Sequence, residues 1–212
     1  YFTKLVEPEQ EAMNVKEGLQ GALKYKRLIF GVIAIFFYVG VEVGIPGEMI
    51  FYISNMPIEH ATAVAGSLAA LYWLLMLVGR FTSTFISGKV SPRTQIVVVS
   101  SVAIVFLLLG IFLPETITVN IYGVVPVKCL FFILCGLCTS VMWGGIFNLA
   151  TEGLGKYTAV ASGIFMTMVV GGGVMPLIQD AIARSAGYIA SYWLVVAMVA
   201  YILWFTVRGS KK

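Results

Sequence analysis

Residues Leu28–Ile53 have the sequence LIFGVIAIFFYVGVEVGIPGEMIFYI. As a helix, this stretch is long enough to cross the ~30 Å hydrocarbon core of a bilayer. One carboxylate, Glu42, lies near its middle. A charge at that depth costs at least ~2.5–3.5 kcal/mol, so such a residue usually faces a polar cavity or a buried base. Glu42 is either a structural residue paired with a base or part of a substrate or proton path, and we favour the path.

The composition is that of an integral membrane protein. Hydrophobic residues make up 59% of the chain and charged residues 11%, whereas soluble domains carry about 25% charged residues. No ten-residue segments of alternating hydrophobicity occur, so the sequence predicts an all-α bundle. The six predicted spans are Leu28–Ile53, Ala61–Ser87, Thr94–Leu113, Val124–Ala150, Tyr157–Ala181 and Gly187–Val207.

The basic residues predict the orientation of these spans. They gather before the first span, between spans two and three, between spans four and five, and after span six. The alternate loops hold only Arg184. By the positive-inside rule, both termini of this chain lie in the cytoplasm. The same distribution accounts for the net charge of +4, so no nucleic-acid partner is predicted.

The chain divides into three parts by composition. Residues 1–26 are polar, with mixed charges, and are predicted to be a cytoplasmic linker that can hold a surface helix. Residues 28–207 form the six-helix bundle, and residues 208–212 form a cytoplasmic tail. The chain begins with Tyr1 and this linker, so we expect it to be a piece of a longer polypeptide.

The three-plus-three arrangement of spans allows an internal inverted repeat. The first and fourth spans would then be equivalent, and both contain residues that interrupt helices: Pro46 in one, Gly144 and Gly145 in the other. Interrupted helices in corresponding positions indicate a transport site. Pro46 is predicted to weaken the outer half of the first span, as either a gate or a static kink.

The first span has two different faces. Tyr38 and Glu42 share one face, and Gly40, Gly44 and Gly47 lie on the opposite one. Glycines let a neighbouring helix approach closely. The Tyr38 and Glu42 face is therefore predicted to look into a cavity.

The fourth span carries a group suited to sugar binding. Trp143 and Phe147 are four residues apart on one face, and Asn148 follows directly. The C–H faces of a sugar stack on aromatic rings, while its hydroxyls bond to amides and carboxylates. The alternative is that these rings only pack against neighbouring helices.

Three residues could form a gate at the cytoplasmic side. Arg80 lies ~29 Å along the second span, and Arg93 and Glu152 lie at the cytoplasmic ends of their spans. We predict that Arg80 or Arg93 pairs with Glu152 when this side is closed. Alternatively, Arg80 extends to lipid phosphate.

The sequence predicts neither an enzyme nor a cofactor protein. It contains no nucleophile–base set, no metal-ligand cluster and no nucleotide motif. Cys135 and Cys138 have C-x-x-C spacing, but no histidine or second cysteine pair accompanies them. Buried cysteines in an apolar helix behave as small hydrophobes.

Several stretches resemble the fucose–proton symporter family of the major facilitator superfamily, which includes bacterial glucose/galactose transporters. They are FFYVGVEVGIPGEM, VGRFTSTFISGKVSPR and SVMWGGIFNLATEGLGKYTAVASG with VVGGGVMPLIQD. The resemblance covers residues 28–207 and implies helices seven to twelve, the carboxy-terminal half of a twelve-helix transporter. Tyr38 and Glu42 would come from helix seven, and Trp143, Phe147 and Asn148 from helix ten, both of which line the cavity in this superfamily.

The resemblance implies a function and a set of partners. We expect secondary transport of a monosaccharide of glucose, galactose or fucose type, by proton symport, in the bacterial inner membrane. The other partner would be an amino-terminal six-helix half. Glu42 either binds sugar hydroxyls or takes part in coupling. The competing hypotheses are a passive sugar facilitator and a six-helix protein that assembles as a homodimer.

Overall fold

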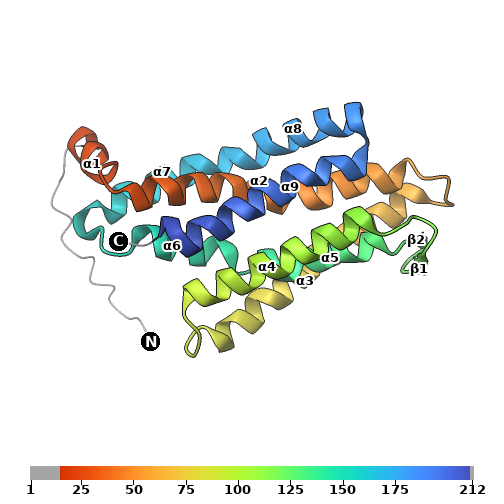
Figure 1. The fold of residues 1–212 in the computed structure, drawn as a ribbon, viewed down its shortest axis with the longest axis horizontal. Helices are drawn as coiled ribbons and strands as arrows, with labels where there is room; N and C mark the ends of the chain where they lie inside the picture. Colours follow the sequence, from red (N-terminus) through yellow and green to blue (C-terminus); the bar gives the residue numbers. More distant parts are fainter. Residues whose placement is uncertain (1–14, 211–212) are drawn as a thin grey trace, which may run out of the picture.

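The computed structural model describes residues 15–210, in which six helical segments lie side by side along the longest axis (Figure 1). Each is long and apolar enough to cross a bilayer, so the described chain is a multi-pass membrane bundle. The six predicted spans are confirmed, with ends that move by a few residues. The observed spans are Lys26–Ser54, Ala61–Ile86, Pro92–Phe112, Lys128–Thr151, Gly155–Ala186 and Tyr188–Gly209.

The first three spans are single helices, and the last three are divided into shorter pieces. The single helices are α2 (Lys26–Ser54), α3 (Ala61–Ile86) and α4 (Pro92–Phe112). The fourth span consists of α5 (Lys128–Thr139) and α6 (Met142–Thr151). The fifth consists of η1 (Gly155–Tyr157), α7 (Thr158–Thr167), η2 (Met168–Val170) and α8 (Gly171–Ala186). The sixth consists of α9 (Tyr188–Trp204) and η3 (Phe205–Gly209). A short helix, α1 (Val15–Ala22), precedes them and packs on α7.

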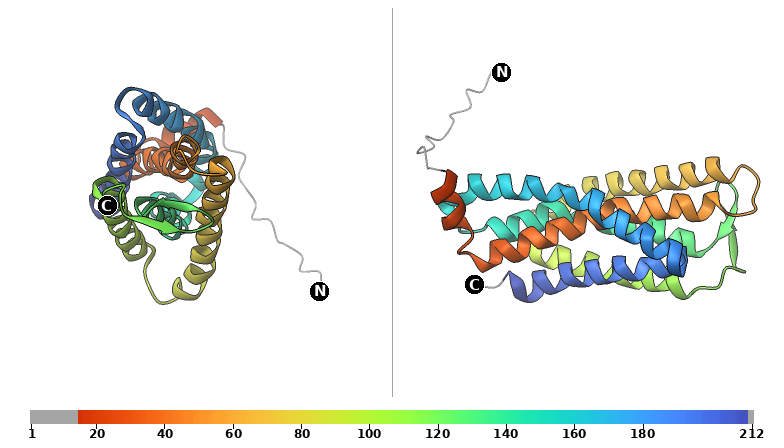
Figure 2. Two further views of the ribbon diagram at one scale, coloured as in Figure 1. Left: turned by 90° about the vertical axis from the view of Figure 1, so that its right-hand side faces the viewer. Right: turned by 90° about the horizontal axis from the view of Figure 1, so that it is seen from above.

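The two ends of the bundle differ, as Figure 2 shows. One end carries α1 and the last described residues, and we name it the terminal end. The other end carries an antiparallel hairpin of β1 (Thr118–Asn120) and β2 (Val124–Pro126), and we name it the hairpin end. The fourth span was expected to begin at Val124. Instead, residues 124–126 pair with β1, and the helix begins only after Pro126, which has no N–H to donate to a helix.

The interruptions predicted in spans one and four differ from those observed. Helix α2 continues without a break through Pro46. The fourth span is interrupted at Ser140 and Val141, and not at Gly144 and Gly145. The Oγ of Ser140 donates to the carbonyl oxygen of Leu137 at 2.6 Å. Such a local bond competes with the regular helical bonds, so the serine turn ends α5 before the glycines are reached.

Close packing of α2 on α8 confirms the role predicted for two of the three glycines. Gly40 lies against Met175, and Gly44 lies against Gln179. Gly47 has open space around it, so its predicted role as a close contact is wrong. On the other side of this contact, Gly171 of α8 lies directly on the backbone of Phe36. Small residues on both helices thus bring the two backbones together.

We predict that Gly171→Ala destabilises the bundle. A methyl group at this position would overlap the carbonyl oxygen of Phe36, and overpacking of this kind costs ~1–3 kcal/mol. The matched control is Gly173→Ala, because the space around Gly173 is open and alanine favours a helix over glycine by ~1 kcal/mol. Unfolding of both purified variants in mixed micelles measures the difference. Equal stabilities would contradict the close contact.

Candidate functional site

An ion pair joins α2 and α3 on the face of α2 away from the glycines. The Nη2 of Arg80 lies 3.3 Å from the Oε1 of Glu42. The Glu42 side chain is 15% exposed and that of Arg80 is 54% exposed. Helical side chains lean toward the amino-terminal end of their helix, so Arg80 reaches back past Met76 toward the middle of the span. Glu42 therefore has the paired base that its depth requires.

The latch expected at the terminal end is not formed in this structure. Arg93 donates to the carbonyl oxygens of Thr206 and Val207, at 2.9 and 3.0 Å. Glu152 pairs with Arg27 at 3.2 Å. Among the described residues, neither Arg80 nor Arg93 pairs with Glu152. The physical reason is that each arginine has an acceptor within closer reach: Glu42 for Arg80, and the free carbonyls at the end of the last span for Arg93.

Two aromatic rings lie beside the ion pair. The rings of Tyr38 and Trp143 meet edge to face, with centroids 6.0 Å apart. Tyr38 is fully buried, and its hydroxyl lies near Glu42 and Arg80 without a hydrogen bond of regular geometry to any described residue. Trp143 is half-buried. The structure thus brings Tyr38 and Glu42 of α2 together with Trp143 of α6, and adds Arg80 of α3.

The other two predicted residues of α6 lie apart from this group. The ring of Phe147 packs against that of Phe165, with centroids 5.2 Å apart. This contact agrees with the alternative given in the sequence analysis, in which the ring of Phe147 packs against a neighbouring helix. Asn148 is exposed, and the described chain offers its side-chain amide no hydrogen bond. Asn148 is therefore free to bond to a molecule beside α6.

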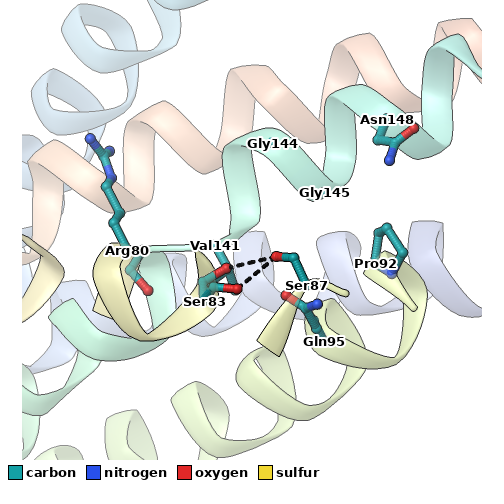
Figure 3. Close-up of a pocket in the computed structure, with 10 residues that line it drawn as sticks. Arg80, Ser83, Ser87, Pro92, Gln95, Val141, Gly144, Gly145 and Asn148 are labelled. Atoms are coloured by element: carbon teal, nitrogen blue, oxygen red, sulfur yellow. Dashed lines mark hydrogen bonds between the residues drawn. The ribbon is translucent and has the colours of Figure 1, made fainter. Parts of the chain in front are cut away.

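A cavity of about 360 Å³ lies between α3, α4 and α6 (Figure 3). It is lined by Arg80, Ser83, Ser87, Gln95 and Asn148, together with the two glycines of α6, Gly144 and Gly145. In Figure 3, Arg80 points from α3 toward α2, while Ser83 and Ser87 are bonded to each other. The cavity is within the ~300–1,000 Å³ range of small-molecule sites. The polar residues of the cavity thus continue from the Glu42–Arg80 ion pair toward the terminal end.

Several polar residues outside the predicted site are buried in the structure. Tyr72 and Thr139 form a buried hydroxyl pair at 3.2 Å. Glu48 is 4% exposed, and its Oε1 has no hydrogen-bond partner among the described residues. Glu48 lies one turn beyond Gly44 on the face that packs against α8. That spacing was the signal that could have identified Glu48 as buried.

A second cluster of polar side chains connects the hairpin end to the membrane spans. Glu115 accepts a hydrogen bond of 2.8 Å from the hydroxyl of Tyr52 in α2. The Nζ of Lys128, at the start of α5, lies 3.5 Å from the same carboxylate oxygen. The connection between α4 and α5 is therefore fixed to both α2 and α5.

This chain is similar in sequence to bacterial sugar transporters. It is 32% identical over 207 residues to a glucose/galactose transporter of Brucella abortus, covering 97% of this chain and 47% of that protein. It is 22% identical over 183 residues to the L-fucose-proton symporter of Escherichia coli, covering 84% of this chain and 39% of the symporter. No protein-family model matches the chain. The chain spans about half the length of the curated relatives it matches.

The fold is that of a known transporter structure. A crystal structure of the major facilitator superfamily transporter FucP, in its outward conformation, superimposes with a TM-score of 0.82. The two share 20% sequence identity, and the match covers 99% of this chain and 48% of that one. The chain has the fold of one half of a major facilitator transporter. The expected resemblance to the carboxy-terminal half of this family is confirmed.

We predict that the Glu42–Arg80 pair has a larger coupling free energy than an exposed pair. The control pair is Asp180–Arg184 of α8, at 2.8 Å, whose side chains are 31% and 79% exposed; such pairs give ~0.3–0.5 kcal/mol. Glu42 is shielded from solvent, so its attraction to Arg80 is screened less. Double-mutant cycles to alanine at both pairs, followed by unfolding in mixed micelles, measure the two couplings. A smaller value for Glu42–Arg80 would contradict the contact.

Proposed function

We propose that this chain is the carboxy-terminal half of a monosaccharide–proton symporter, with its sugar site on the Glu42 and Trp143 side of the bundle. The observation that carries the proposal is the group of Glu42, Arg80, Tyr38 and Trp143, gathered from three spans near the middle of a membrane bundle. Polar and charged residues at such depth usually face a substrate path. The names of the relatives supply the class of substrate.

The chemistry of the group suits a neutral polyol. The half-buried ring of Trp143 offers an apolar face for sugar C–H groups, and the amide of Asn148 offers a donor and an acceptor. Glu42 accepts from hydroxyls, and Arg80 donates to them. Trp143 and Asn148 are five residues apart on α6, so a sugar between them would span the side of the helix that carries Gly144.

The proposed transporter lies in a specific membrane and needs a second half. The chain lies in the bacterial inner membrane, with the terminal end in the cytoplasm, where basic residues gather. Residues 1–26 then form the central linker, which contains α1. An amino-terminal six-helix half covers the sugar site from the other side, since superfamily members enclose substrate between two halves. We propose that the Arg93, Arg80 and Glu152 gate belongs to a different conformation of the same transporter.

Two alternatives, a passive facilitator and a homodimer of this chain, are separated from symport by one experiment. Cells that express the complete gene product are given glucose, galactose or fucose in weakly buffered medium. Symport makes the medium alkaline as the sugar enters, whereas facilitated diffusion moves sugar without a pH change. A homodimer would show the same transport when only this chain is expressed.

We predict that Glu42→Gln keeps sugar binding within about tenfold, or ~1.4 kcal/mol, and that Glu42→Ala loses more. Glutamine preserves the shape and hydrogen-bonding capacity of glutamate but removes its charge and its proton site. Sugar counterflow in proteoliposomes measures binding and exchange, and uphill accumulation measures coupling. The control is Glu59→Gln, since Glu59 is 92% exposed in a loop at the hairpin end.

The two measurements assign the role of Glu42. Loss of accumulation with intact counterflow in Glu42→Gln assigns proton coupling to this residue. Retained accumulation assigns hydroxyl binding. Wild-type transport by both Glu42 variants would remove the residue from the site.

We predict that Trp143→Ala weakens sugar affinity by about tenfold, whereas Trp143→Phe keeps most of it. A contact between two aromatic rings is worth ~0.5–1.5 kcal/mol, and we take the same range for a sugar stacked on Trp143; phenylalanine retains a ring for this contact. The control is Trp193→Ala, because Trp193 packs against Phe112 and lies outside the site. Calorimetric titration of the purified transporter with each sugar measures affinity. An equal loss in Trp143→Ala and Trp193→Ala would indicate a purely structural effect.

A further inference from the structure

A second cavity, of about 850 Å³, opens at the terminal end between the beginning of α2 and the end of the last span. Four basic residues line it: Lys24, Lys26, Arg27 and Arg208. It lies outside the proposed sugar site, since the two cavities share no lining residue. Helix ends mark the level at which a membrane span leaves the hydrocarbon core, so this cavity lies at the depth of lipid headgroups.

Three of the four basic side chains are available to a ligand. Arg27 is held by Glu152 at 3.2 Å. Lys24, Lys26 and Arg208 are exposed, and within residues 15–210 none of them has an acidic partner. The cavity therefore carries an excess of positive charge, and the ligand that balances it is an anion.

Aromatic residues form the wall of the cavity on the side of the membrane. Phe30 and Trp204 meet edge to face with centroids 5.2 Å apart, and Tyr25 lines the rim. Trp204 and Tyr25 are each 41% exposed. Tryptophan and tyrosine favour the interface because one end of the ring system is apolar and the other is polar. The site thus joins an anion-binding rim to an apolar wall.

We propose that this cavity binds an anionic phospholipid, with the phosphodiester between Lys24, Lys26 and Arg208 and the upper acyl chains along Trp204 and Phe30. Basic pockets at the ends of membrane spans bind anionic headgroups in this way. The cavity has both parts that such a ligand needs, whereas a free phosphate would use only the rim. This proposal does not depend on the identity of the transported sugar.

The test compares two variants with the same loss of charge at the terminal end. Lys24→Gln with Arg208→Gln removes two charges from the cavity rim. The matched control is Lys89→Gln with Lys156→Gln, two exposed residues that do not line the cavity. The complete transporter is purified in detergent, and native mass spectrometry measures retention of added phosphatidylglycerol and phosphatidylcholine. Inorganic phosphate is added in a separate arm.

The wild-type protein and the control should retain phosphatidylglycerol in preference to phosphatidylcholine. The rim variant should bind phosphatidylglycerol more weakly by roughly tenfold to thirtyfold, at about tenfold per 1.4 kcal/mol and ~1 kcal/mol for each basic residue. Lys24→Arg with Arg208→Lys keeps the charge and should retain the lipid, which tests the site even if the glutamine variant folds poorly.

Three results would overturn the proposal. Equal losses in the rim variant and the control would show a general effect of surface charge. Displacement of the lipid by millimolar inorganic phosphate would show a site for a free anion. Equal retention of phosphatidylglycerol and phosphatidylcholine by the wild-type protein would show that the rim charges do not select the lipid.

Discussion

The bundle depends on keeping the two faces of α2 different. On one face, Gly40 and Gly44 allow α8 to approach until side chains of α8 fill the space that a Cβ would take. On the other, Glu42 reaches across to Arg80 of α3. In hydrocarbon the first face gains from close contact between helices, and the second must satisfy a charge at mid-depth. Helix α2 also contacts α9 and α6, so it links the packed side of the protein to its polar side.

The break at Ser140 and Val141 gives the fourth span two sets of neighbours. Helix α5 packs on α3 and α4, whereas α6 packs mainly on α2 and α4. Trp143 follows the break directly, and its position beside Tyr38 therefore depends on the direction that α6 takes there. At the end of α5, just before the break, the hydroxyl of Thr139 is hydrogen-bonded to the buried hydroxyl of Tyr72. The aromatic part of the proposed sugar site thus lies at the junction of two short helices.

The spans and the glycine face of α2 could be predicted because hydropathy and helical periodicity are local properties of the sequence. Tyr38 and Glu42 were placed correctly on one face for the same reason. Arg80 was placed at the terminal end because its position along α3 was counted from the backbone, while the lean of its side chain toward the helix start was not considered. The partner of Glu152 could not be predicted, since several arginines lie at similar depth and only the packing brings Arg27 next to it.

The pairing of Glu42 with Arg80 has an electrical consequence. While Glu42 is ionised, the two side chains together carry no net charge, so a conformational change that exposes them to either side of a membrane transfers no net charge of their own. Moving one elementary charge through 100 mV is worth ~2.3 kcal/mol, a cost that an unpaired Glu42 would add to one direction of the proposed transport cycle. In the proposed transporter, an intact ion pair would leave the voltage dependence of this half to the ions that enter with the neutral sugar.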